Sequence, residues 1–155
     1  LTLGRGVDLF VLEPNVGNFV RVAQQLQIPT RGKTYCVNEA NLDSFPAGYR
    51  RYLAQCRQQG YGSRYVGAMV ADVHRVLLQG GIFLYPPTAK APQGKLRLMY
   101  EANPMAFILE QAGGCGSTGS GEILDFAPNS LHERVPVILG SCADVAALKL
   151  ELARD

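Results

Sequence analysis

The chain has 155 residues, of which 47% are hydrophobic and 18% charged, and its formal net charge is +2. This composition is typical of one globular domain that can bury a core without disulfides or metals. Fifteen cations against thirteen anions do not make the basic surface that nucleic-acid binding requires, and no apolar run is long enough to cross a membrane. We therefore predict a soluble, cytoplasmic protein that binds neither nucleic acid nor membrane. A local cluster of cations would still suit a small anion.

Hydrophobic periodicity predicts strands that alternate with helices. The expected strands cover residues 7–12, 34–37, 64–66, 82–85, 95–100 and 135–139. The expected helices cover residues 16–23, 46–59, 69–78, 103–112 and 141–152, and glycines follow several of them. This alternation predicts a single α/β domain with a layered, mixed and largely parallel sheet flanked by helices.

The segment 95–101 combines two cations, Lys95 and Arg97, with one carboxylate, Glu101. In a strand, Lys95 and Arg97 would share one face with their charges roughly 7 Å apart, which suits a phosphate. Two charge-assisted hydrogen bonds of about 1.5 to 3 kcal/mol each would suffice for micromolar recognition. The alternative is that both cations belong to a solvated sheet face.

Other polar residues allow two interpretations. Glu101 precedes the helix start Asn103-Pro104, where a carboxylate either ligates a divalent cation or favours the helix N-terminus. The periodicity makes Asn103 the N-cap and Pro104 the first helical residue. Asp72 and His74 fall inside an expected helix, and a structural role is favoured because neither has an identifiable catalytic partner in the sequence.

The four cysteines, Cys36, Cys56, Cys115 and Cys142, are widely spaced and include no Cys-x-x-Cys pair. With only two histidines in the chain, this pattern disfavours a zinc site. We expect buried, reduced thiols.

Four segments of the sequence resemble the class I fructose-1,6-bisphosphatases. They read RYVGAMVADVHR, GGIFLYP, GKLRLMYEANPMAFILEQAGG and PVILGS, and the match is dense over residues 64–141 and looser before them. The resemblance covers only the C-terminal, substrate-binding half of that family. It implies a phosphatase of gluconeogenesis and carbohydrate metabolism, a hydrolase that uses Mg²⁺ to convert fructose 1,6-bisphosphate into fructose 6-phosphate and phosphate.

The resemblance assigns the phosphate remote from the reaction to three residues of this chain. It implies that Asn38, Tyr65 and Tyr85 contact this distal phosphate, and that Arg64 reaches the site of a neighbouring subunit. The family forms dimers of dimers, so we expect a homo-oligomer. One departure is Ala40-Asn41, where many relatives have Gly-Tyr, so a further tyrosine contact is absent or replaced.

The resemblance also implies roles near the reacting phosphate. Met69 would lie against the sugar and Lys95 would contact the sugar or its phosphate, while Arg97 and Glu101 would face the reacting phosphate and its metals, Glu101 as a ligand. No catalytic residue is expected within this half. In the family the other Mg²⁺ ligands come mostly from the N-terminal half, which includes an Asp-Pro-x-Asp-Gly-type motif that does not occur here. We therefore expect an absent upstream half and an inactive isolated chain.

Two alternatives remain open from the sequence. One is a stand-alone module that binds a sugar phosphate without turnover. The other keeps the reaction but changes the substrate to sedoheptulose 1,7-bisphosphate.

Overall fold

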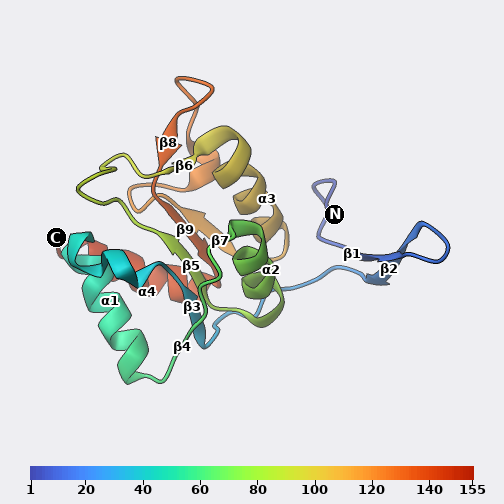
Figure 1. The fold of residues 1–155 in the computed structure, drawn as a ribbon, viewed down its shortest axis with the longest axis horizontal. Helices are drawn as coiled ribbons and strands as arrows, with labels where there is room; N and C mark the ends of the chain where they lie inside the picture. Colours follow the sequence, from blue (N-terminus) through green and yellow to red (C-terminus); the bar gives the residue numbers. More distant parts are fainter.

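A computed structural model describes all residues 1–155, and a five-stranded sheet lies at its centre (Figure 1). The strand order is β4-β3-β5-β9-β7. The strands are β3 (Thr34–Cys36), β4 (Gly62–Ser63), β5 (Ile82–Tyr85), β7 (Cys115–Ser117) and β9 (Val137–Gly140). β3 is parallel to β4 and β5, whereas β9 is antiparallel to β5 and β7. The predicted mixed α/β sheet is confirmed, but the expectation that it is largely parallel is wrong, because β9 runs antiparallel to both of its neighbours.

Two pairs of helices cover the two faces of this sheet (Figure 1). The helices are α1 (Ala47–Gln58), α2 (Met69–Gln79), α3 (Asn103–Gln111) and α4 (Cys142–Leu152). Because neighbouring residues of a strand point to opposite faces, Phe83 packs in the core with α2 and α3, while Ile82 and Leu84 pack in the core with α1 and α4. These four helices agree with the predicted ones, and none has the length and apolar character needed to span a membrane.

A short antiparallel ribbon lies beside the main sheet. It consists of β6 (Leu96–Arg97) and β8 (Arg134–Val135), and a π-helical turn at Leu98–Ala102 then leads into α3. The predicted strand over 95–100 is therefore wrong beyond Arg97. The reason is that Leu98 and Ala102, one helical turn apart, are both buried in the core. Two 3₁₀ helices, Glu39–Ser44 and Ile123–Asp125, lie in the connecting segments.

The N-terminal residues form a hairpin of β1 (Leu9–Glu13) and β2 (Asn18–Ala23), which extends away from the body of the molecule (Figure 1). The predicted helix over 16–23 is wrong, because a turn with Gly17 at φ +73° reverses the chain and pairs Leu12 with Phe19. The hairpin carries exposed large apolar side chains, namely Val11, Leu12, Val16, Phe19, Val20 and Val22.

Three further local predictions need correction. The strand expected at 64–66 lies instead at Gly62–Ser63, since the Val66 N–H donates to the Asp72 carboxylate at the start of α2. β7 was not predicted, because its sequence Cys-Gly-Ser has no β-branched or aromatic residue. Asn103 is not an N-cap, because the preceding turn is already helical and leaves its buried Oδ1 without a partner.

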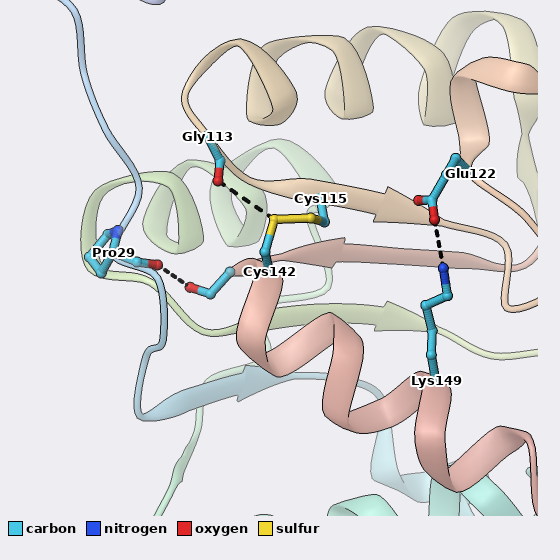
Figure 2. The surroundings of a disulfide bond; sticks show 7 residues. Pro29, Gly113, Cys115, Glu122, Cys142 and Lys149 are labelled. Carbon is cyan, nitrogen blue, oxygen red and sulfur yellow. Dashed lines mark hydrogen bonds and ion pairs between the residues drawn. A yellow bond between two sulfur atoms is a disulfide. The ribbon is translucent and has the colours of Figure 1, made fainter.

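The prediction of reduced thiols is wrong for one pair of cysteines. Cys115 and Cys142 form a disulfide between the start of β7 and the start of α4 (Figure 2). The sheet brings them together, because Cys115 pairs with Gly140 of β9 and α4 begins two residues later. Their Cα atoms are 5.0 Å apart, which a disulfide readily bridges. Cys36 and Cys56 are buried free thiols, as predicted, and burial raises the pKa of each to about 11.

Candidate functional site

Two hollows open beside the C-terminal end of β5. The first, which we call the Arg97 hollow, has a volume of about 230 Å³. Its lining consists of Tyr65, Gly67, Met69, Phe83, Tyr85, Lys95, Leu96, Arg97 and Glu101. The structure thus brings together six of the residues that the sequence proposed for the site: both cations, the carboxylate, both tyrosines and the methionine.

The second, which we call the Arg134 hollow, has a volume of about 340 Å³. Its lining consists of Asn38, Asn41, Tyr85, Pro86, Thr88, Lys90, Ala91, Lys95 and Arg134. Tyr85 and Lys95 belong to both linings, so the two hollows are neighbours that share these side chains.

The fold explains why Tyr85 and Lys95 lie where they do. Tyr85 is the last residue of β5, because Pro86 and Pro87 end the strand directly after it. Lys95 precedes Leu96, whose buried side chain anchors β6 in the core and leaves its neighbour exposed. The end of β5 thus places the Tyr85 hydroxyl, and the start of β6 places the Lys95 ammonium group, beside both hollows.

Glu101 is held by the residue that begins its own helical turn. Its Oε2 accepts the backbone N–H of Arg97 at 2.7 Å and lies 3.5 Å from the Arg97 guanidinium. This contact resembles the reciprocal bond of a capping box, so the carboxylate stabilises the start of the turn. No hydrogen bond to the other oxygen, Oε1, is present, which leaves that oxygen available to a ligand.

The two tyrosines of the Arg97 hollow are suited to donate hydrogen bonds. Burial raises the pKa of Tyr65, and the nearby Tyr85 hydroxyl and Asp72 carboxylate add to the effect. The Tyr65 hydroxyl therefore keeps its proton at neutral pH. A phosphate oxygen is an acceptor that matches such a donor.

Two of the proposed site residues, Asn38 and Arg64, do not line the Arg97 hollow. The Asn38 side chain accepts the Ala40 N–H at 3.2 Å, which orients it within its turn at the edge of the Arg134 hollow. Arg64 is exposed, lines neither hollow and donates to the Ser63 carbonyl at 2.9 Å. Its expected role in a neighbouring subunit stays a prediction.

Asp72 and His74 do not take part in either hollow. Asp72 is fully buried, and its carboxylate accepts from Arg75 at 2.9 Å and from the Val66 N–H. It fixes the start of α2, which agrees with the structural interpretation of this pair, and His74 is exposed on the same helix.

Sequence reasoning did not single out Lys90 or Arg134, and it mentioned Asn41 only as a departure. Lys90 lies in the loop after β5, and Arg134 follows a long irregular segment. Only the antiparallel pairing of β6 with β8 places Arg134 beside Arg97, and no local pattern encodes that pairing.

The chain does not contain a metal site of its own. No three His, Cys, Asp or Glu side chains gather closely enough to hold an ion. Mg²⁺ takes about six oxygen ligands, so Glu101 could supply one of them but cannot hold the ion alone. The residues present therefore do not fit a Mg²⁺ cluster.

Comparisons with known proteins agree with the resemblance seen in the sequence. Residues 28–152 match the family model described as the C-terminal domain of fructose-1-6-bisphosphatase. A class 1 fructose-1,6-bisphosphatase of Synechococcus elongatus is 53% identical over 155 residues, which are 99% of this chain and 45% of that protein. Fructose-1,6-bisphosphatase isozyme 2 of Bos taurus is 51% identical over 150 residues, which are 94% of this chain and 44% of that protein.

A solved structure has the same fold over nearly the whole chain. The crystal structure of Leishmania major fructose-1,6-bisphosphatase in holo form matches with a TM-score of 0.96 and 42% identity. The match covers 99% of this chain and 48% of that one. The chain thus spans about half the length of the relatives that it matches.

Proposed function

The chain belongs to the fructose-1,6-bisphosphatase family, in the part described as the C-terminal domain, and we propose that it supplies the sugar-phosphate site of such an enzyme. The parent reaction would hydrolyse the 1-phosphate ester of fructose 1,6-bisphosphate. Water adds to phosphorus, the bond between phosphorus and the sugar oxygen breaks, and fructose 6-phosphate and phosphate leave. The observation that carries the proposal is the sharing of Tyr85 and Lys95 by two neighbouring hollows, one of which also presents Arg97 and Glu101.

Each side chain of the site has a defined task in this proposal. Lys95 and Arg97 neutralise phosphate charge, and the hydroxyls of Tyr65 and Tyr85 donate hydrogen bonds to phosphate oxygens. Met69 is half-buried in the wall of the Arg97 hollow and offers an apolar surface to the sugar. These groups bind and orient the substrate, which is a large part of phosphoryl-transfer catalysis.

We also propose that Glu101 contributes one ligand to Mg²⁺ and that the others come from a separate part of a longer protein. The chain's single carboxylate at the hollow supports this division. The exposed apolar side chains of the β1–β2 hairpin would contact that other part. On this proposal the 155-residue chain alone hydrolyses no fructose 1,6-bisphosphate, and Mg²⁺-dependent phosphate release by the purified chain would contradict the division.

Titration of the purified chain with fructose 6-phosphate tests the binding site itself. We expect Lys95→Ala and Tyr85→Phe to weaken binding by about tenfold each, because each removes a hydrogen-bond donor to phosphate. Lys33→Ala and Tyr100→Phe are matched controls, since both residues are exposed and line neither hollow. Equal affinity of all four variants would refute the proposed site.

The absence of a metal cluster favours one second candidate, a module that binds a sugar phosphate without turnover. Fructose 6-phosphate binding without any activity in the longest available form of the protein would support it. A preference for seven-carbon substrates is tested by titrating sedoheptulose 7-phosphate beside fructose 6-phosphate.

We also propose an oligomeric state and a cellular location for the protein. The exposed Arg64, which reaches neither hollow of its own chain, supports a homo-oligomer in which it serves a neighbouring site, a dimer of dimers for the full enzyme. Light scattering of the longer protein tests this. For a cytoplasmic location, we expect Cys115 and Cys142 to be thiols in the cell, because the cytosol keeps most cysteines reduced.

A further inference from the structure

One segment beside the Arg97 hollow has no buried side chain to hold it in place. The residues 64–68, between β4 and α2, are all exposed and form no helix or strand, yet Tyr65 lines the hollow from this segment. An exposed segment of this kind is generally mobile, because few apolar contacts fix its conformation. The position of the Tyr65 hydroxyl therefore depends on the polar contacts of the neighbouring backbone.

An ion pair on α2, formed by Asp72 and Arg75, supplies these contacts. The two oxygens of the Asp72 carboxylate accept the Val66 N–H at 3.2 and 3.1 Å. The Arg75 guanidinium donates to the Arg64 carbonyl at 3.1 Å. Arg75 also donates to Asp72 at 2.9 Å, so the two side chains, about one helical turn apart, act as one unit. Each of them thus bonds both to its partner and to the exposed segment.

These bonds fix the backbone on both sides of Tyr65. The Arg64 carbonyl belongs to the peptide group before Tyr65, and the Val66 N–H belongs to the peptide group after it. Because a peptide group is planar, the orientations of these two groups determine the φ and ψ angles of Tyr65. The Asp72–Arg75 pair therefore sets the direction in which the Tyr65 side chain leaves the backbone.

The burial of this ion pair points beyond a stabilising role. The Asp72 side chain has no exposed area, and the Arg75 side chain is 25% exposed. Burying a carboxylate has a desolvation cost that the attraction of its partner often only offsets, so a buried ion pair is weak evidence for stability. Its burial does give the carboxylate a fixed position, because α2 packs in the core through Val73, Val76 and Leu77. A rigid helix thus holds the exposed segment.

We propose that Asp72 and Arg75 are positioning residues for the sugar-phosphate site and that they act through Tyr65. This rests on the proposed function, in which the Tyr65 hydroxyl donates to a phosphate oxygen. Neither Asp72 nor Arg75 lines a hollow, so neither contacts the substrate itself. Met69, the first residue of α2, does line the Arg97 hollow. The helix therefore serves the site once directly and once through the segment 64–68.

A mutant cycle on the purified 155-residue chain tests this role, with fructose 6-phosphate binding measured by calorimetry. The variant Asp72→Leu/Arg75→Met removes both charges together, so no unpaired charge stays buried and the fold should be retained. We expect it to bind fructose 6-phosphate about fivefold more weakly, because the released Tyr65 side chain must be ordered on binding. In a Tyr65→Phe background, the same change should alter the affinity by less than about twofold.

Two further variants complete the experiment. Asp72→Asn keeps the shape of the side chain and should show a smaller weakening that also depends on the Tyr65 hydroxyl, so the cycle can be completed even if the double variant does not fold. Asp144→Ala is the matched control, since it removes another buried carboxylate that accepts a backbone N–H but lines neither hollow. It should lower stability and leave the affinity for fructose 6-phosphate unchanged.

The outcomes separate the positioning role from the proposed function. If Lys95→Ala weakens fructose 6-phosphate binding but the Asp72 variants do not, the positioning role is refuted and the proposed function stands. The same holds if the Asp72 variants weaken binding equally with and without the Tyr65 hydroxyl, or if Asp144→Ala weakens it as much. If the wild-type chain binds no fructose 6-phosphate, or if Lys95→Ala leaves its affinity unchanged together with all the other variants, both proposals fail.

Discussion

The two ends of the central sheet use their polar groups differently. At the end where β5 begins and β9 ends, the Ser141 hydroxyl donates to the Pro29 carbonyl at 2.6 Å and accepts the Gly81 N–H at 3.0 Å. The buried Asp144 carboxylate accepts the Gly32 N–H at 2.9 Å and the Tyr61 hydroxyl at 2.8 Å. The disulfide adds a covalent link at this end (Figure 2).

At the opposite end, where β5 finishes at Tyr85, the charged side chains are exposed and mostly unpaired. Lys95 and Arg134 have no acidic partner there, and Glu101 leaves one oxygen free. The comparison indicates which polar groups serve the fold and which are available to a ligand. A buried polar group must be satisfied within the protein, whereas exposed cations at a hollow keep their capacity for an anion. We therefore expect substitutions at the first end to change stability and substitutions at the second to change binding.

The largest expected effect is loss of the disulfide. The bond closes a segment with a sequence separation of 27, so reduction should lower the free energy of unfolding by about 3.5 kcal/mol. Denaturant unfolding with and without dithiothreitol measures this change, and fructose 6-phosphate affinity should stay constant. The double variant Cys115→Ser/Cys142→Ser is the control, because dithiothreitol should not destabilise it further. A reduced protein as stable as the oxidised one would contradict this expectation.

Asp144→Ala should destabilise the protein by about 2 kcal/mol, because it leaves the Gly32 N–H and the Tyr61 hydroxyl without their acceptor. Asp43→Ala is the matched control at an exposed aspartate with no ion pair, and it should change stability by less than about 0.5 kcal/mol. Urea unfolding of both variants checks the difference. Similar losses in the two variants would remove the distinction between the ends of the sheet.

At the end of the sheet where β5 finishes, Glu101→Gln should strengthen binding of inorganic phosphate by about threefold in the absence of metal. The reason is that the substitution removes a negative charge from the Arg97 hollow. The glutamine oxygen can still accept the Arg97 N–H, so stability should change little. Calorimetry at low salt measures the affinity, and the gain should shrink as salt increases. Weaker binding by this variant would show that the carboxylate does not face the anion.

The smallest expected effect concerns stability at acid pH. Hydrogen bonds from Gln55 and Arg51 hold the pKa of Glu151 below its ordinary value. The unfolded state then binds the proton more readily, so the stabilisation is present above about pH 4.5 and is lost as the pH falls through the folded pKa. Glu151→Gln should therefore show a shallower loss of melting temperature below about pH 4.5.

Glu110 provides a control of opposite sign. Burial raises its pKa, and the Glu122 and Asp125 carboxylates add to this. The contribution of Glu110 to the free energy of unfolding is thus present at low pH, and it is lost as the pH rises through the pKa of the folded state. Glu110→Gln should leave the acid loss of stability at least as steep as in the wild type, and a shallower loss in this variant would contradict the assignment.

Much of the fold could be predicted because it is encoded locally. Helices α1 to α4 follow from the spacing of their apolar residues and from the glycines and prolines beside them. The hairpin was mistaken for a helix because Val16, Phe19, Val20 and Ala23 fit a helical spacing, and only the pairing with β1 settles the structure. The disulfide depends on the pairing of β7 with β9, which the spacing of the cysteines does not reveal.

The candidate site also combines residues that are close in sequence with one that a long-range pairing brings in. Lys95, Arg97 and Glu101 are close in sequence, so their grouping could be predicted from the residues, even though the segment turns helical after Arg97. Arg134 is brought to the site by a long-range pairing and could not be predicted.

The most direct test of the account is a crystal structure of the chain with fructose 6-phosphate. We predict that its phosphate lies within hydrogen-bond distance of Tyr85 and Lys95, on the side of the Arg134 hollow. A phosphate bound elsewhere, with both hollows empty, would contradict the central claim that this end of the sheet is the sugar-phosphate site.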